Sequence, residues 1–181
     1  DGEIGYAIGE YLGFIFIGTN RGIRMASMNS DGSLTLGPRI STPQPVHCFE
    51  GEDRFVWYGN SEIDPKYAAL GNEVLPTGVV CGLGRMDLTE FTVGPLSPAY
   101  ANDMFTTNET GKVVNSIITF GDKRVFAVNG GGVYFESDNK VPSGWLTQGK
   151  MSFSVEDLKA ALYMQANWEP GCQGKLYLDI A

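Results

Sequence analysis

The stretch Phe14-Ile15-Phe16-Ile17-Gly18 returns later in the chain as Phe55-Val56-Trp57-Tyr58-Gly59. Three shorter matches extend this repeat: 51–56 with 121–126, Arg24-Met25 with Arg85-Met86, and 34–38 with 91–95. Units of roughly 40–50 residues with several short strands are typical of β-propeller blades. The repeat therefore predicts an all-β chain with about three propeller-type blades.

The matches divide the chain into units that begin near Tyr6, Val46 and Lys112. Apolar runs and turn residues predict strands at 13–18, 23–28 and 33–36 in the first unit and at 113–120, 124–128 and 133–136 in the third. In the second unit they predict strands at 46–49, 54–58, 82–88 and 89–93, with a turn at 50–53. Asp31-Gly32 is a strong hairpin signal, because these residues accept positive φ.

The second unit contains an insertion of about twenty residues, Asn60 to Val80, where the first unit has a short turn. Long loops on a rigid scaffold often carry binding residues, and they also serve as covers over a neighbouring blade. Both interpretations of this insertion stay open.

The end of the chain follows a different pattern. Apolar residues alternate over 158–168 and again over 175–180, which predicts two strands, although the residue types of the first stretch and the sequence 154–157 favour a helix. A fourth strand of the third unit is placed around 143–146. We therefore place the propeller-like repeats at 1–143 and a second, partial domain at 144–181.

Three blades are too few for an ordinary propeller, which closes with four to eight. Missing sequence or other chains could supply further blades, or the three units could form an open stack. Because an open array leaves strands unpaired, we expect the chain to work within a larger assembly.

The charge of the chain limits its partners. It has 181 residues and a net charge of −8, from 13 Lys and Arg against 21 Asp and Glu. Nucleic-acid binding depends largely on basic contacts, so we expect no nucleic-acid partner. No apolar run approaches the roughly 20 residues of a membrane helix, so we expect no membrane insertion. The chain starts at Asp1 without a signal peptide, which we interpret as a processed product or part of a longer chain.

The sequence offers little for catalysis, metal binding or a cofactor, and we expect none of them. His47 is the only histidine, and its neighbour Cys48 points to the opposite face of a strand. Three cysteines allow at most one disulfide, and buried thiols are the simpler interpretation. Acidic residues of the turn 50–53 are expected to be solvated.

Five residues are candidate binding residues: Trp57, Tyr58, Glu62, Asp64 and Tyr67. Trp57 and Tyr58 are adjacent on a strand, so only one of them is expected to face the core, and core packing is the simpler role for Trp57. Glu62 and Asp64 lie in the insertion, where two carboxylates could act on a glycan.

The stretch Ser143-Gly144-Trp145-Leu146-Thr147-Gln148-Gly149-Lys150-Met151, followed by Asp157-Leu158-Lys159 and an alternating strand, resembles a junction in minor tail proteins of tailed bacteriophages. Residues 18–23 and 120–124 are similar to blades of those proteins. The resemblance implies that a β-sandwich begins within 144–181. It also implies a virion component at the tail tip or baseplate, without catalytic residues to transfer.

We therefore expect a structural or recognition protein of a phage tail, located in the virion, that acts in assembly or host attachment. Its expected partners are other tail proteins in an oligomeric assembly, and a host surface glycan or protein. The alternative is an extracellular carbohydrate-binding or carbohydrate-active propeller.

Overall fold

The computed structural model of the chain describes residues 2–42, 44–61, 81–91, 94–106 and 112–138. The chain divides into two compact units, 1–140 and 141–181, and all described residues belong to the first. The part of the chain that the structure describes is all-β and contains no helix, hence none that could cross a membrane. The predicted strands after 142, the predicted second domain 144–181 and residues 62–80 of the insertion lie outside the described residues.

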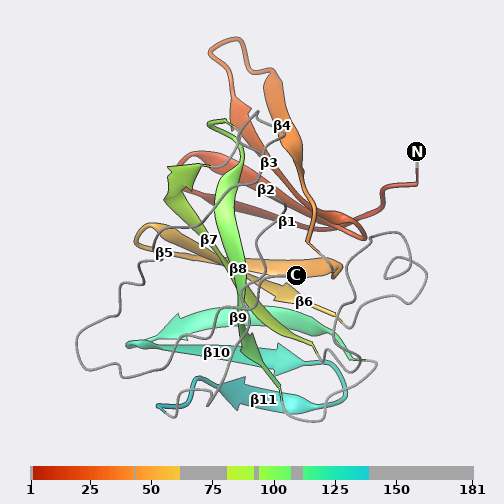
Figure 1. Ribbon diagram of the computed structural model, residues 1–181, viewed down its shortest axis with the longest axis vertical. Helices are drawn as coiled ribbons and strands as arrows, with labels where there is room; N and C mark the ends of the chain where they lie inside the picture. Colours follow the sequence, from red (N-terminus) through yellow and green to blue (C-terminus); the bar gives the residue numbers. More distant parts are fainter. Residues whose placement is uncertain (1, 43, 62–80, 92–93, 107–111, 139–181) are drawn as a thin grey trace, which may run out of the picture. The chain divides into compact units, whose positions relative to one another are not determined.

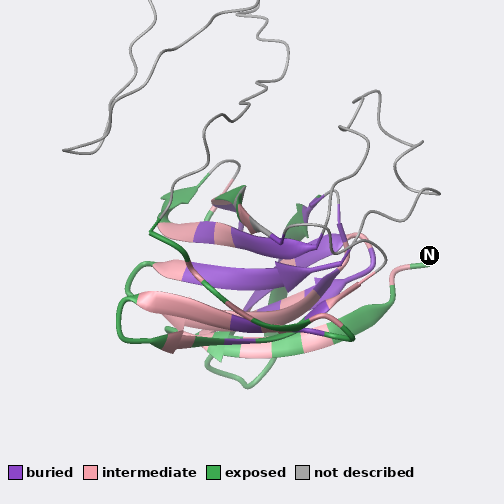
Figure 2. Cartoon of the chain, turned by 90° about the horizontal axis from the view of Figure 1, so that it is seen from below, coloured by how far each residue is buried: buried purple, intermediate pink, exposed green. Residues whose placement is uncertain are grey.

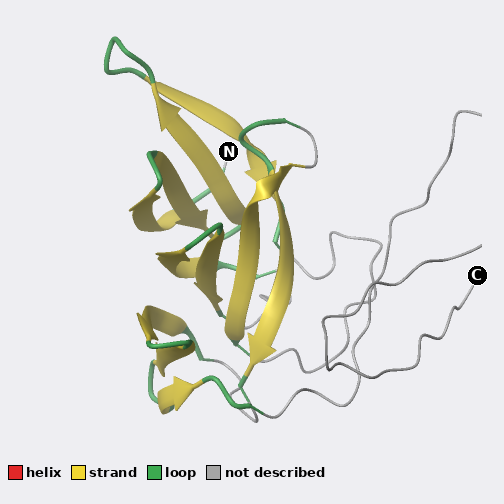
Figure 3. Cartoon of the chain, turned by 90° about the vertical axis from the view of Figure 1, so that its left-hand side faces the viewer, coloured by secondary structure: helices red, strands yellow, loops and turns green. Residues whose placement is uncertain are grey.

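The described strands form three antiparallel sheets, each following the order of the chain (Figures 1 and 3). The first sheet contains β1 (Gly5–Tyr11), β2 (Phe14–Thr19), β3 (Gly22–Met28) and β4 (Leu34–Ile40). The second contains β5 (Val46–Glu52), β6 (Phe55–Asn60), β7 (Gly82–Phe91) and β8 (Pro98–Phe105). The third contains β9 (Val114–Phe120), β10 (Lys123–Val128) and β11 (Gly132–Phe135).

The first hairpin of each sheet has the same construction. A two-residue turn joins its strands, and the first turn residue has a positive φ: +50° at Leu12, +52° at Asp53 and +65° at Gly121. A bulge also follows the first residue of β1, β5 and β9. Residues that lie the same number of positions from these turns are therefore structurally equivalent in the three sheets.

The sheets stack through their first strands, because β1 packs against β5 and β5 packs against β9. Phe16, Met25, Tyr58 and their neighbours form a buried cluster at the first junction, between the first and second sheets. Trp57, Leu83, Phe126 and their neighbours form another at the second junction, between the second and third sheets. The second sheet is therefore covered on both faces. Figure 2 shows buried residues gathered in the middle of the strands and exposed ones at the turns and on parts of the outer strands.

Both junctions depend on a glycine, and the two glycines occupy equivalent positions of their sheets. A Cβ on Gly18 would lie 2.5 Å from the carbonyl oxygen of Val46, and a Cβ on Gly59 would lie 2.7 Å from Cγ1 of Val114. Val46 and Val114 are the first residues of β5 and β9. Each glycine thus lets the next sheet approach closely.

The predicted strands of the first unit and the first three of the third unit are confirmed, with β4 extending four residues beyond its predicted end at 36. The structure adds β1 before them. Within the described residues, the all-β prediction is also confirmed. The alternation of apolar residues and the turn residues were sufficient for these elements, because both act locally.

The predicted turn 50–53 is wrong, because β5 continues to Glu52 and the turn is Asp53-Arg54. Residues 51–56 therefore lie two positions out of structural register with 121–126. A shift of two residues along a strand leaves each side chain on the same face of the sheet. The apolar pattern therefore still matched, although the alignment was two residues out of register.

The predicted hairpin of 82–88 with 89–93 is also wrong. β7 runs without interruption from Gly82 to Phe91, and β8, which was not predicted, pairs with it as the fourth strand. Gly94 and Pro95 lie in the connection between them, where the Ser97 N–H donates to the Gly94 carbonyl. Their sequence counterparts, Gly37 and Pro38, lie within β4.

Candidate functional site

The predicted binding residues Trp57 and Tyr58 are both buried, with exposed fractions of 2% and 0%. The expectation that only one would face the core is wrong, because the second sheet has a neighbour on each face. Trp57 belongs to the second junction and Tyr58 to the first. Among the described residues, neither ring lies on the surface.

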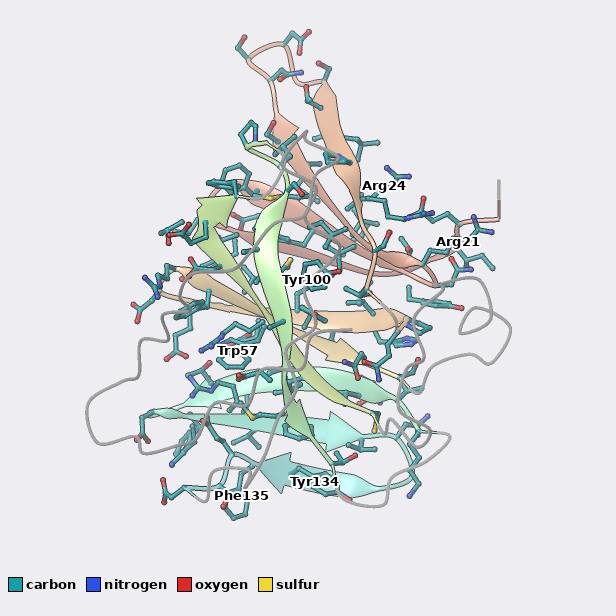
Figure 4. The ribbon with its side chains drawn as sticks, in the orientation of Figure 1. Arg21, Arg24, Trp57, Tyr100, Tyr134 and Phe135 are labelled. Carbon is teal, nitrogen blue, oxygen red and sulfur yellow. The ribbon has the colours of Figure 1, made fainter. Side chains whose placement is uncertain are left out.

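Trp57, which is labelled in Figure 4, contacts two arginines as well as apolar side chains. The guanidinium carbons of Arg124 and Arg85 lie 4.6 and 5.2 Å from its ring centre. Its buried Nε1 finds no acceptor among the described residues. The contacts are of the cation–π type, which favours a role for Trp57 in holding the second junction together.

Arg124 on β10 is the central ion-pairing residue of this region. It donates to Glu52 on β5 at 2.8 Å and to Glu136, which follows β11. Burial alone would lower the pKa of Arg124, but the hydrogen bonds to Glu136 and Glu52 outweigh it and raise the pKa. A permanently charged arginine therefore ties the second and third sheets together.

A second arginine pair lies around Phe55, whose ring centre is 4.7 Å from Arg54 and 4.6 Å from Arg85. Arg54 pairs with Asp87 at 3.4 Å. We call Arg54, Phe55, Trp57, Arg85 and Arg124 the arginine–aromatic cluster.

This cluster was not predicted from the sequence, and the pairing of Arg124 with Glu52 was missed because Glu52 was assigned to a solvated turn. The recurring arginines at 54, 85 and 124 were visible in the repeat and could have indicated it.

Tyr58 is enclosed between the first sheet and its own neighbour β7. A Cβ on Gly84 would lie 2.1 Å from the Tyr58 ring, so only glycine fits there. The buried hydroxyl of Tyr58 has no hydrogen-bond partner among the described residues. Burial raises the pKa of Tyr58, and the nearby Tyr100 and Asp103 raise it further. The neutral hydroxyl is consistent with a core residue.

The other predicted binding residues, Glu62, Asp64 and Tyr67, lie outside the described residues. Their assignment stays a prediction.

His47 and Cys48 are not arranged as a nucleophile with its base. The His47 ring stacks on Tyr6 with centres 4.7 Å apart, and burial lowers the pKa of His47. Burial raises the pKa of the Cys48 thiol to about 12, so the thiol is neutral at ordinary pH. Cys48 and Cys81 both carry thiols rather than a disulfide. Across the described ranges, no group of three acidic, His or Cys side chains could hold a metal ion.

A pocket of about 280 Å³ lies where β4 meets the β7–β8 connection. It is lined by Leu36, Gly37, Pro38, Gly94, Pro95 and Leu96. A Cβ on Gly37 would lie 2.4 Å from Cβ of Leu96, so the two segments touch there. The residues that line this pocket are apolar, and none of them has an acidic, basic or nucleophilic side chain.

The most conspicuous surfaces are two apolar sheet faces at the ends of the stack. Strand alternation places Ile118, Phe120, Val125, Ala127, Val133 and Phe135 on the third-sheet outer face. It places Ile8, Ile15, Ile17 and Leu36 on the first-sheet outer face, together with the charged Glu10 and Arg24 and the buried Ala26.

Several of these side chains are among the most exposed large apolar side chains of the described residues, including Ile8 at 79% and Phe135 at 75%. Contiguous apolar patches of this kind mark interaction surfaces.

Several positions of the two outer faces are buried elsewhere in the chain. Ile8 is equivalent to Ile117, which is only 5% exposed within the second junction. Val133 is equivalent to Ile23 and Leu83, which are fully buried within the first and second junctions. Ile8 and Val133 therefore stand at positions that are packed inside the stack in other sheets.

Comparisons with protein-family models, with curated proteins and with solved structures gave no match to this chain. Its own residues and their geometry are the grounds on which its function is inferred.

Proposed function

We propose that the three sheets are successive blades of a propeller-type array, and that the chain is a structural or recognition component of a phage tail. It would act at the tail tip or baseplate, in virion assembly or host attachment. Its action would be to present surfaces to neighbouring proteins, with other blades covering its two outer faces.

The observation that carries this proposal is the contrast between equivalent residues. Ile8 is exposed on the first-sheet outer face, whereas Ile117 is buried at the same position of the third sheet. Burial of apolar surface contributes roughly 25 cal/mol per Å², so an uncovered face of this construction favours association. A chain with such a face at each end is suited to a larger assembly.

The two predicted binding residues that the structure describes also fit a structural role better than a catalytic one. Trp57 and Tyr58 are packed into the two junctions, and the ion pair of Arg124 with Glu52 joins the second and third sheets. The assignment to a phage tail is supported by the resemblance of residues 143–151 and the repeats to minor tail proteins.

The location can be tested on tailed phage particles whose genome encodes this chain. Antibodies raised against residues 1–181 should label the tail end in electron micrographs, and absorption with the purified chain should remove the label. Particles that contain no such chain, or that carry it only on the head, would contradict the proposal.

A panel of polysaccharides tests the carbohydrate-active alternative. We expect no cleavage by the wild-type chain. Cleavage that is lost in the double variant Glu62→Gln, Asp64→Asn would instead favour an enzyme.

A further inference from the structure

We propose that Asn129 is a self-modification site. Its side-chain amide is converted to a carboxylate in the folded chain, through a cyclic imide that forms with the backbone nitrogen of Gly130. Water is the one co-reactant. The proposal is independent of the proposed function, because it rests on the turn between β10 and β11 (Figure 1).

The sequence and the space around this turn favour the reaction. Asn129-Gly130 is the only asparagine–glycine pair among the 181 residues. A backbone nitrogen can attack the side-chain amide of the asparagine before it, and glycine hinders the attack least because it has no Cβ. Both residues are exposed. Gly130 has a φ of +70°, and a Cβ on it would meet nothing within 4 Å. The imide ring therefore has room to form.

Hydrogen bonds hold the turn on either side of the two reacting groups. The N–H of Asn129 donates to the Val113 carbonyl at 2.9 Å, and the N–H of Gly131 donates to the Val128 carbonyl at 2.9 Å. Between them, the Gly130 N–H and the Asn129 side-chain amide make no hydrogen bond with the described residues. The two groups can therefore meet without breaking a hydrogen bond.

Asn20 stands at the equivalent position of the first sheet, and its side chain is held. It follows β2 directly, as Asn129 follows β10. The Asn20 side chain accepts from the Ile4 N–H at 2.7 Å and donates to the Gly2 carbonyl at 3.1 Å. The same turn position therefore leaves the asparagine amide restrained in one sheet and unrestrained in the other.

The backbone nitrogen after Asn20 is engaged as well. The N–H of Arg21 donates to Oγ1 of Thr19 at 3.1 Å. An attack on the Asn20 amide would have to break this hydrogen bond together with those of the side chain. The structure therefore predicts that a glycine at position 21 would not make Asn20 as reactive as Asn129.

The reaction balances with water alone. The Gly130 nitrogen gives its proton to solvent and bonds to Cγ of Asn129. The Cγ–Nδ2 bond breaks, and Nδ2 takes up a proton and leaves as ammonia. Water then opens the imide at one of its two carbonyl carbons. Opening at Cγ gives aspartate, and opening at the backbone carbon gives isoaspartate, in which the main chain runs through Cβ and Cγ.

The two products differ in their effect on β11. Each adds one negative charge close to Lys112, whose ammonium group donates to the Gly130 carbonyl at 2.9 Å. Isoaspartate also lengthens the main chain within the turn, which changes the geometry of the hydrogen bond between Gly131 and Val128. We therefore expect isoaspartate to loosen β11 and aspartate to leave it paired.

The test incubates the chain of residues 1–181 in mildly alkaline buffer and follows the asparagines by peptide mass spectrometry. In the wild type, Asn129 should be converted to aspartate and isoaspartate, of which isoaspartate is specific to the imide. Asn129→Gln should prevent the conversion, because glutamine would need a larger ring. Circular dichroism checks that each variant is folded.

Arg21→Gly is the matched control. It places a glycine after Asn20, so that the chain contains two asparagine–glycine pairs. In the folded variant, Asn20 should be converted at least about tenfold more slowly than Asn129, because its hydrogen bonds must break first. In concentrated urea, the two rates should become equal.

Hydrogen exchange tests the effect on β11. The amides of β11 should exchange faster in the isoaspartate product than in Asn129→Asp, which has the same charge on an unaltered main chain. Equal exchange would overturn the loosening of β11. Retention of Asn129 in the folded wild type would overturn the proposal. Equal rates at Asn20 and Asn129 in folded Arg21→Gly, or aspartate without isoaspartate at position 129, would also overturn it.

Discussion

Met25 on β3 and Met86 on β7 pack into one buried cluster, from opposite sides of the first junction. Their sequence contexts, Arg24-Met25 and Arg85-Met86, match each other, but the pairing of the strands makes Met25 equivalent to Arg85. A shift of one residue along a strand moves a side chain to the other face. The two methionines can therefore meet because the sequence repeat and the structural repeat are one residue out of register.

The close approach at the first junction predicts that Gly18→Ala is destabilising. The new Cβ would lie 2.5 Å from a backbone oxygen of Val46, which cannot move without shifting β5. We expect a loss of about 1–3 kcal/mol in the free energy of unfolding, measured by urea denaturation. Gly94→Ala is the control, since its Cβ would meet nothing within 4 Å and its loss should stay below about 0.5 kcal/mol. Equal losses for the two variants would contradict the assigned contact.

Arg124→Met should destabilise the chain more than Arg54→Met. Methionine keeps most of the apolar stem but leaves Glu52 and Glu136 without their shared cation. Because these carboxylates are partly exposed, we expect a loss of about 1–2 kcal/mol. The Arg54 side chain is 58% exposed, and its removal should cost less than about 0.5 kcal/mol. Thermal denaturation of both variants checks the difference, and a larger loss for Arg54→Met would rule out the central role of Arg124.

Tyr58→Phe should leave the stability unchanged or raise it by up to about 1 kcal/mol. The hydroxyl is buried and makes no hydrogen bond with the described residues. Its removal therefore eliminates the desolvation cost of an unsatisfied polar group. Tyr58→Ala should instead cost about 3–5 kcal/mol by leaving a cavity. A clear loss of stability in Tyr58→Phe would show that the hydroxyl has a partner.

Because of His47, the free energy of unfolding should decrease as the pH falls below 6.5. Burial lowers the pKa of His47 below its ordinary value of 6.5, so the unfolded chain takes up this proton at a higher pH than the folded chain. The contribution of His47 to stability is therefore present above pH 6.5 and is lost as the pH falls through the pKa of the folded state.

The single imidazole can be followed by NMR, which should give a midpoint below 6.5. His47→Gln should remove this part of the pH dependence while the carboxylates still titrate. A midpoint above 6.5 would be evidence against the burial of the ring.

The candidate binding residues show how much of the site could be predicted from the sequence. Trp57 and Tyr58 were identified as large aromatic residues on a strand, and alternation correctly placed them on opposite faces. Alternation says nothing about how many faces are covered, so the burial of both could not be predicted. The pairing of Glu52 with Arg124 joins residues 72 positions apart, and no local pattern reports such a contact.

By itself, the sequence determined that the described residues form short antiparallel strands, and it placed most of them. These features depend on side-chain alternation and on turn residues, which act over a few positions. Only the tertiary structure decided the register between sheets, the course of β7 and β8, and the burial of the second sheet on both faces. These features depend on which surfaces meet, and that is settled by packing between residues far apart in the chain.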